Sequence, residues 1–274
     1  FWGLNGFWTG ADLTALRERF GMNLWQCATR FPEVAAETYF PAARAAGVRM
    51  TLRLTGGHSH YTRDGSFDLA AWKATLAPWT AEPWKGLLEE AIADGTLVGH
   101  MLLDDIANFE GRDPTGDDLE EMARTSKAGF PGLMCFVRER ATEVPVPSGG
   151  RYQQLDCCVN QYKHLDGPVE VFAAETAARA GQLGLGLISG LNLCDGGDGR
   201  SGQPGWRKDR WAMSGDEISS YGRVMAAVPG LRMFLCWEYD GEEAWTDGSK
   251  GSDWLDQPAQ ASALAELGAL LVGL

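Results

Sequence analysis

The sequence predicts a single (β/α)8 barrel, and three observations support this fold class. Short apolar runs of strand character alternate with segments of helical periodicity almost throughout the chain. Eight such runs can be counted, and alternating strands and helices form a parallel sheet that eight units close into a barrel. The length of 274 residues suits a fold that needs roughly 250. We therefore expect one domain over residues 1–274, with its chemistry at the C-terminal ends of the strands.

The expected strands and helices follow one another in order along the chain. The strands cover residues 2–8, 22–29, 48–54, 97–104, 132–138, 155–162, 184–193 and 231–237. The helical patterns cover residues 13–20, 33–46, 68–93, a segment after Thr115, 169–183, a segment from about Ser214, and 260–271. The segment 141–150 is rich in Pro and Gly, so we expect a loop there and no clear fifth helix.

Local signals predict where several helices begin and end. Gly47 stands where a left-handed residue commonly ends a helix. Ser214 and Glu217 have the Ser-x-x-Glu spacing of a capping box. Pro78 and Pro83 interrupt the longest helical pattern, because proline cannot continue a helix interior.

A doubly wound open sheet is the structural alternative to the barrel. Such a sheet usually carries a Gly-rich phosphate loop after its first strand, but Gly3, Gly6 and Gly10 do not form GxGxxG. The glycine-rich run at 196–199 lacks the GK[ST] ending of a P-loop. The sequence therefore favours the barrel.

The charge balance excludes some partners. The chain has 37 acidic and 24 basic residues and a formal net charge of −13, which argues against nucleic acid because that partner requires a basic surface. It suits a neutral substrate. No apolar run approaches the roughly 18 residues that span a bilayer. No signal region is visible in the sequence, which leaves the location open and favours a secreted or periplasmic one.

The six cysteines lie in apolar runs without CxxC spacing. They are Cys27, Cys135, Cys157, Cys158, Cys194 and Cys236. We expect buried thiols that pack as small hydrophobic side chains; a disulfide between two of them has no support in the spacing.

Polar side chains gather where the predicted strands end. In a (β/α)8 barrel these positions build the active site. The substrate-binding candidates are Asn5 and Trp8 on the first strand, Arg53 on the third and His58 in the loop after it, Arg138 on the fifth, Gln161 and Tyr162 on the sixth, Asn192 on the seventh and Asp195 just after it, and Trp237 on the eighth.

Two of the strand ends carry carboxylates of special interest. Asp104 and Asp105 close the fourth strand, and Glu238 closes the eighth. Fourth and eighth strands lie on opposite sides of an eight-stranded barrel, so their carboxylates can flank a substrate. Hydrolysis of a glycosidic bond needs two such groups. Asp195 is a third candidate.

Asp104 and Asp105 cannot both point inward in regular strand geometry, because adjacent side chains alternate. We favour Asp105 as the general acid, since it lies nearest the loop, with Glu238 as nucleophile or base. The alternative is that one of the two aspartates only caps the strand or pairs with Arg53 or Arg138.

The aromatic content supports a carbohydrate substrate. The chain has 11 Trp, and aromatic faces stack on sugar rings while polar side chains bond the hydroxyls. Trp237, beside Glu238, is the best candidate for a stacking platform. Trp72, Trp79 and Trp84 lie in helical patterns and are expected to pack helices.

Eight βα units, the carboxylates at the ends of strands four and eight, and Trp237 resemble the TIM-barrel glycoside hydrolases. The resemblance covers the whole chain as architecture and implies glycosidase activity without a cofactor. The large retaining group has Asn-Glu on strand four and Glu on strand seven. This chain has Asp104-Asp105 and Asn192 there, and the DxxDxDxE motif of chitinase-like barrels is absent. No defined family follows, and the stereochemistry stays open.

The sequence leaves two other functions open. His58 and His60 form an HxH pair that His164 and Asp105 could join as ligands of a metal-dependent hydrolase. Amidohydrolase-type barrels place HxH on strand one, however, and the chain has 4 His, so we expect no essential metal. The second alternative is a barrel without catalysis that binds sugar or a protein. The sequence leaves the oligomeric state open.

The segment 195–211 is a long glycine-rich loop after the seventh strand. It holds Trp206 and Trp211 together with basic side chains. Loops of this length are usually functional or disordered. We expect it to fold over the barrel mouth and to form one wall of the substrate cleft; a mobile surface loop is the alternative.

Overall fold

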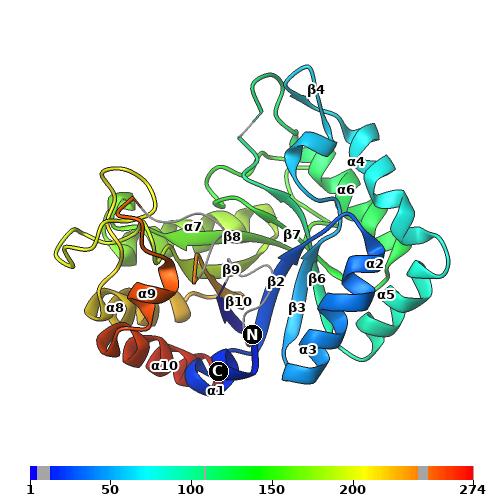
Figure 1. Ribbon diagram of the computed structural model, residues 1–274. Helices are drawn as coiled ribbons and strands as arrows, with labels where there is room; N and C mark the ends of the chain where they lie inside the picture. The colour runs from blue at the N-terminus through cyan, green and yellow to red at the C-terminus, as the bar shows by residue number, and fades with distance from the viewer. Residues whose placement is uncertain (5–12, 108, 240–245, 274) are drawn as a thin grey trace. The chain divides into compact units, whose positions relative to one another are not determined.

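The computed structural model describes residues 1–4, 13–107, 109–239 and 246–273. Eight parallel strands are hydrogen-bonded in the order β1-β10-β9-β8-β7-β6-β3-β2 and close into a barrel (Figure 1). This confirms the predicted fold class. The barrel strands are β1 Trp2–Leu4, β2 Leu24–Ala28, β3 Arg49–Arg53, β6 Leu97–Asp104, β7 Met134–Arg138, β8 Cys157–Tyr162, β9 Gly186–Leu191 and β10 Leu231–Cys236.

Helices connect most of the strands. They are α1 Leu13–Phe20, α2 Pro32–Val34, α3 Phe40–Ala46, α4 Leu69–Leu76, α5 Trp84–Ala93, α6 Gly116–Gly129, α7 Val169–Leu183, α8 Gly215–Ala226, α9 Gly251–Leu255 and α10 Pro258–Val272. Short helical turns are the π-helical η1 Ala35–Tyr39 and the 3₁₀ turns η2 His58–His60, η3 Ala77–Thr80 and η4 His164–Asp166. No helix among the described residues is long and apolar enough to cross a membrane.

The chain divides into two compact units. The terminal unit comprises Phe1–Gln26, Asn160–Ala178 and Leu187–Leu274. The central unit comprises Cys27–Val159 and Arg179–Gly186.

The central unit is built on β3, β6, β7 and the start of β8. Thr51 of β3 pairs with Gly99 of β6, and Asp104 at the end of β6 pairs with Arg138 at the end of β7. Figure 1 shows α3 and α5 beside β3 and β6. The indole of Trp72 donates to the carbonyl of Leu102 at 3.1 Å, and both Trp72 and Trp79 are buried. The expected helix-packing role of these two tryptophans is confirmed.

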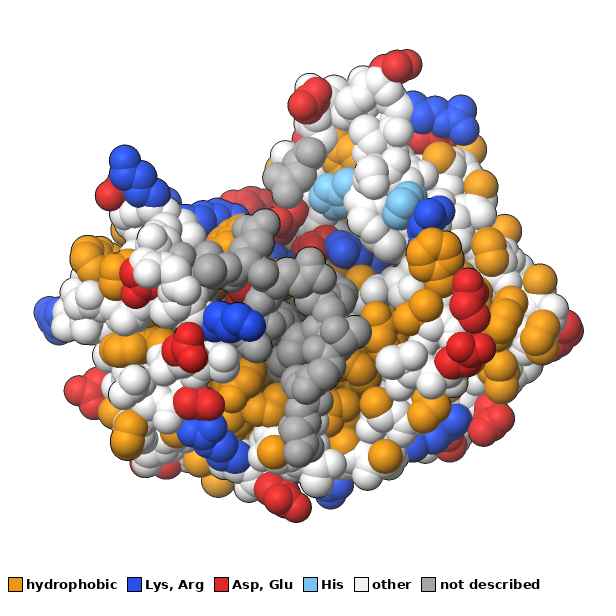
Figure 2. Space-filling view, viewed as in Figure 1, with side chains coloured by type: hydrophobic (Ala, Val, Ile, Leu, Met, Phe, Trp, Pro, Cys, Tyr) orange, Lys and Arg blue, Asp and Glu red, His pale blue; other side chains and the backbone are white. Residues whose placement is uncertain are grey.

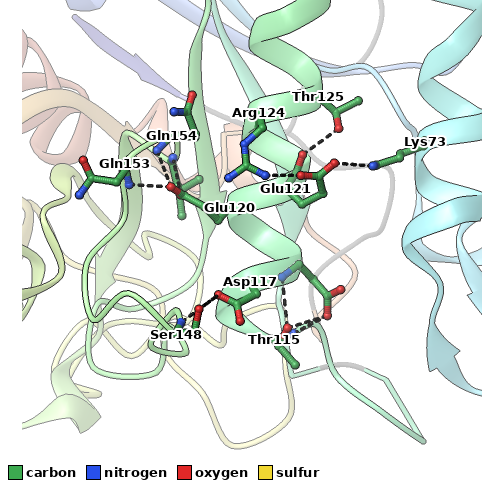
Figure 3. A network of polar contacts seen from close by, with 12 residues as sticks. Lys73, Thr115, Asp117, Glu120, Glu121, Arg124, Thr125, Ser148, Gln153 and Gln154 are labelled. Carbon is green, nitrogen blue, oxygen red and sulfur yellow. Dashed lines mark hydrogen bonds and ion pairs between the residues drawn. The ribbon is translucent and has the colours of Figure 1, made fainter.

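The segment between β7 and β8 has no helix, as the sequence predicts, and α6 holds it in place. The buried carboxylate of Glu120 accepts backbone N–H groups from Gln153 at 2.7 Å and Gln154 at 2.9 Å (Figure 3). Asp117 accepts the backbone N–H of Ser148 at 2.8 Å. A Cβ on Gly116 would lie 2.4 Å from the backbone N of Pro147, so the loop packs directly on the helix. These bonds satisfy backbone groups that a helix would otherwise pair internally.

In the terminal unit, α10 packs on α8 and on β1. Trp2 of β1 pairs with Phe234 of β10, and its indole donates to the carbonyl of Phe20 at 3.0 Å. The predicted capping box at α8 is present: Ser214 Oγ accepts the N–H of Glu217 at 3.3 Å, and Glu217 accepts the N–H of Ser214 at 2.8 Å. These contacts fix β1, β10 and α8 within the terminal unit.

Other local predictions agree with the structure. Gly47 ends α3 in the left-handed conformation, with φ 64°. The long pattern from residue 68 breaks at η3, and α5 begins only after Pro83. All six cysteines are buried thiols that form no disulfide bond. Burial raises the pKa of Cys135 and of Cys236 to about 12, as expected for inert thiols.

The structure also contains elements that the sequence analysis missed. β4 Thr62–Arg63 and β5 Ser66–Phe67 form a small antiparallel hairpin after η2. Asp64 and Gly65 join them with φ of 48° and 74°, and an Asp-Gly pair with positive φ is a common hairpin turn. Strands of 2 residues are too short for their alternation to show in the sequence. Of the first expected strand, residues 5–8 lie outside the described part.

Candidate active site

A carboxylate held between two guanidinium groups lies at the end of β6 in the central unit. Arg53 Nη1 is 2.9 Å from Asp104 Oδ2. Arg138 Nε is 3.0 Å from Asp104 Oδ1, in an ion pair without hydrogen-bond geometry. The side chains are mostly buried, with exposed fractions of 13% for Arg53, 17% for Arg138 and 22% for Asp104. The pairing that the sequence analysis kept as an alternative therefore exists at Asp104.

Asp105 lies in a different environment from its neighbour. It follows β6 with φ 48°, a left-handed conformation that Asp tolerates better than most residues. Its side chain is 50% exposed and lies 4.0 Å from Arg138 Nε. Its backbone N–H donates to the carbonyl of Arg138 at 3.0 Å. Asp105 is thus the more accessible of the two carboxylates, and non-glycine residues held at positive φ are frequent at functional sites.

His58 lies next to Asp104 and is held there by two contacts. Its Nε2 contacts the backbone carbonyl oxygen of Asp104, and its ring stacks on Phe109 with centroids 5.0 Å apart. The buried Tyr61 packs edge-on to His58, and its hydroxyl has no hydrogen-bond partner among the described residues. Burial raises the pKa of Tyr61. No group of three or more metal-ligating side chains occurs in the described part of the chain.

Glu139 is a titratable residue that was not among the site residues predicted from the sequence. It follows β7, and its carboxylate accepts the N–H of Ile106 at 3.1 Å and the N–H of Arg140 at 3.0 Å. Burial raises its pKa to about 7, aided by a hydrogen bond with Glu143 and by the negative charge of Asp105. Its place at a strand end was visible in the sequence, but its proximity to two other carboxylates was not.

In the terminal unit, Asn192 and Asp195 organise the loop after β9. Asn192 Oδ1 accepts the backbone N–H of Asp195 at 2.9 Å. The Asp195 side chain is buried and accepts the backbone N–H of Arg207 at 3.0 Å. A Cβ on Gly205 would lie 2.3 Å from the backbone carbonyl oxygen of Cys194 and 2.6 Å from Asp195 Oδ1, which explains the need for glycine there. Both predicted residues therefore have structural partners inside the loop.

The loop 195–211 is an ordered substructure within this unit. Gly197 donates to the carbonyl of Trp211 at 2.8 Å, and Pro204 forms an antiparallel bridge with Trp211. Trp206 packs, together with Trp237, against the buried residues Cys194 and Ala212. The loop thus places a second indole in the same cluster as the predicted platform. Its position over the barrel mouth stays a prediction.

Glu238 lies two residues beyond β10 and is 4% exposed. The peptide bond between Trp237 and Glu238 is cis. Trp237 continues the sheet beyond β10, because its N–H donates to the carbonyl of Leu191 at 2.9 Å and it bridges Asn192 in parallel. Trp237 and Glu238 are thus fixed to the strand end rather than carried by a free loop.

The other candidates from the sequence are Gln161, Tyr162, Asn5 and Trp8. Gln161 Nε2 donates to the carbonyl of Leu235 at 3.1 Å, which ties β8 to β10. Tyr162 is buried, and its hydroxyl donates to the carbonyl of Gly167 at 2.7 Å. Asn5 and Trp8 lie outside the described residues. The structure therefore groups Arg53, His58 and Arg138 with Asp105 in one unit, and Asn192, Asp195 and Trp237 in the other.

The fold is shared with solved glycosidases, although no family model and no curated protein matches the chain. An endocellulase of the archaeon Pyrococcus horikoshii matches at 13% identity and a TM-score of 0.59, over 97% of this chain and 92% of that one. The catalytic domain of the major endoglucanase of Xanthomonas campestris pv. campestris matches at 12% and 0.56, over 97% and 93%. Endo-glycoceramidase II of Rhodococcus sp. matches at 13% and 0.57, over 96% and 78%.

Proposed function

We propose that the chain is a glycoside hydrolase that cleaves a poly- or oligosaccharide with two carboxylates, Asp105 and Glu238. The observation that carries this proposal is their position at the ends of β6 and β10, in a barrel whose fold is that of endoglucanases and an endoglycoceramidase. In the strand order, three strands separate β6 from β10 in either direction. Carboxylates on such strands can flank a glycosidic bond.

Asp105 is the general acid in this proposal, and Glu238 is the nucleophile or base. Asp105 is half-exposed beside Arg138, so it can reach a leaving-group oxygen. Glu139 offers a second proton donor, because a pKa of about 7 keeps part of its carboxyl protonated at neutral pH. Asp104 serves to position Arg53 and Arg138, since its oxygens contact both.

In this proposal, polar and aromatic side chains at the strand ends contact the substrate. Arg53, His58 and Arg138 supply donors for sugar hydroxyls on the central unit. Trp237 and Trp206 supply aromatic faces on the terminal unit, where Asn192 and Asp195 hold the loop that carries Trp206. A small-molecule site typically combines aromatic walls with a small number of polar groups, and a sugar ring fits such a combination.

The proposal is tested by hydrolysis of a glycan panel that includes cello-oligosaccharides and β-glucans. On any substrate cleaved, Asp105→Asn and Glu238→Gln should each lower kcat/KM by about 10²–10⁴-fold, the usual contribution of acid–base groups. Glu89→Gln, an exposed residue of α5, is the control for removal of one carboxylate. Full activity in both site variants would reject the pair.

Aryl glycosides with good and poor leaving groups test the roles within the pair. A good leaving group needs no proton, so Asp105→Asn should lose much less activity on a dinitrophenyl glycoside than on a natural glycan. Glu238→Gln should be impaired on both. The same leaving-group pattern for Glu139→Gln, with Asp105→Asn impaired on both substrates, would move the acid role to Glu139.

A further inference from the structure

A groove on the central unit combines aromatic and positively charged side chains outside the group around Asp104. Its volume is about 520 Å³, and its lining includes Arg30, Phe31, Glu33, His60, Arg63 and Trp84. Arg30 follows β2 and His60 ends η2, which follows β3. The groove therefore lies at the C-terminal ends of barrel strands, where ligands of this fold bind. Figure 2 shows histidine, basic and hydrophobic side chains adjoining on the face in view.

Arg30 is available to a ligand. Its guanidinium lies over the ring of Phe31, 4.5 Å from the centroid. Within the described part of the chain it makes no ion pair, although the protein has 37 acidic residues. Stacking on a ring fixes the plane of a guanidinium and leaves its N–H edge free for a planar, two-oxygen acceptor. A carboxylate is such an acceptor.

Positive charge dominates next to Arg30. Gly56, at φ +66°, lets His60 approach, because a Cβ on Gly56 would lie 3.0 Å from Cδ2 of His60 and 3.4 Å from Cβ of Arg30. The pKa of His60 is lowered, first by burial and then by the charges of Arg30 and Arg53. Arg30 and Arg53 repel a positive charge on His60, so the same two cations would attract an anion placed beside it.

The other lining groups suit a sugar more than a bare ion. Phe31 is 45% exposed, so its ring offers an apolar face for a sugar ring. Glu33 is the acidic side chain on the lining and can accept hydroxyl hydrogen bonds. Arg63 is engaged with Asp68 at 2.7 Å, which leaves Arg30 as the principal anion ligand.

We propose that this groove binds a sugar residue that carries a carboxylate, a uronic acid, as a subsite of the glycoside hydrolase proposed above. The carboxylate pairs with Arg30, the sugar ring lies on Phe31, and the hydroxyls reach Glu33 and His60. Arg53 lies between the subsite and the group around Asp104. Its charge lowers the pKa of His60, and its guanidinium pairs with Asp104. The positive charge of this groove is local, because the chain as a whole has a formal net charge of −13.

Binding is measured by calorimetry with trigalacturonate, cellotriose and sodium sulfate as separate probes. The protein carries Asp105→Asn and Glu238→Gln, so that no probe is cleaved during the titration. Trigalacturonate should bind about tenfold or more tightly than cellotriose, the size of one charge-assisted hydrogen-bond pair. Its binding should weaken when NaCl rises from about 50 mM to about 500 mM.

Arg30→Gln should weaken trigalacturonate binding about tenfold, whereas Arg124→Gln, which removes one charge from the exposed face of α6, should not. Phe31→Ala should weaken the trisaccharide but not sulfate. Equal affinity for the two trisaccharides, or no effect of Arg30→Gln, would overturn the subsite. Sulfate binding as tight as trigalacturonate would show a general anion site instead. Specific trigalacturonate binding by a protein that hydrolyses no glycan would reject the proposed enzyme and leave the groove standing.

Discussion

Arg138 Nε lies 3.0 Å from Oδ1 of Asp104, in a pair whose side chains are 17% and 22% exposed. The same nitrogen is 4.0 Å from Asp105, whose side chain is 50% exposed. Two consecutive carboxylates therefore lie at different distances from one guanidinium and differ in solvent access. Asp104 holds the guanidinium groups of Arg53 and Arg138 in position, whereas the Asp105 side chain is half exposed to solvent.

This difference predicts unequal effects on stability. Asp104→Asn leaves Arg53 and Arg138 without their shared counter-charge in a mostly buried setting, and should lower the free energy of unfolding by about 2–3 kcal/mol. Asp105→Asn changes a half-exposed side chain that lies 4.0 Å from Arg138 Nε and should cost less than about 1 kcal/mol. Denaturant unfolding of both variants beside the wild type measures the two values. Equal losses would show that Asp104 is not the buried partner.

Glu139 predicts a pH dependence of stability. Its pKa is about 7 in the folded protein, above the roughly 4.3 of an unperturbed Glu. The folded state therefore holds this proton more tightly than the unfolded state does. The resulting stabilisation is complete below about pH 4 and is lost as the pH rises through about 7.

Glu139→Gln should remove this pH-dependent contribution, because Gln stays neutral in both states. The free energy of unfolding, measured from about pH 4 to about pH 8, should fall more steeply with rising pH in the wild type than in the variant. Glu143→Gln should flatten the profile partly, since Glu143 helps to raise the pKa of Glu139. Parallel profiles for the wild type and Glu139→Gln would contradict the raised pKa.

The loop 195–211 predicts a substrate contact through its indoles. Trp206→Ala and Trp211→Ala should raise KM for a cleaved glycan by about threefold to tenfold, the value of one aromatic contact. Trp211 is 39% exposed, so its removal should leave the melting temperature nearly unchanged. Leu165→Ala, which removes an apolar side chain that is 62% exposed, is the control. An unchanged KM in both tryptophan variants would make the loop a bystander.

The carboxylate mechanism predicts that activity survives a chelator. His58 is held by the Asp104 carbonyl and by Phe109, and the proposed reaction uses proton transfer between side chains. Hydrolysis after exhaustive dialysis against EDTA should match the untreated protein. Inactivation reversed by zinc or manganese would instead make His58 and His60 candidate ligands.

The sequence by itself determined the barrel and the list of residues at its strand ends. Strand and helix periodicity identify eight βα units, and parallel strands bring their C-terminal ends to one edge. That reasoning located Asp105, Trp237 and Glu238 without coordinates. It also found the helix-free segment 141–150, because Pro and Gly mark it locally.

Only the tertiary structure decided which side chains share a charge environment. Arg53 and Asp104 are 51 residues apart in the chain yet 2.9 Å apart in space. The raised pKa of Glu139 likewise depends on burial and on the charge of Asp105, which follows another strand. Periodicity records which face a residue occupies. Electrostatic interaction depends on distance and burial, which are set when separate strands pack together.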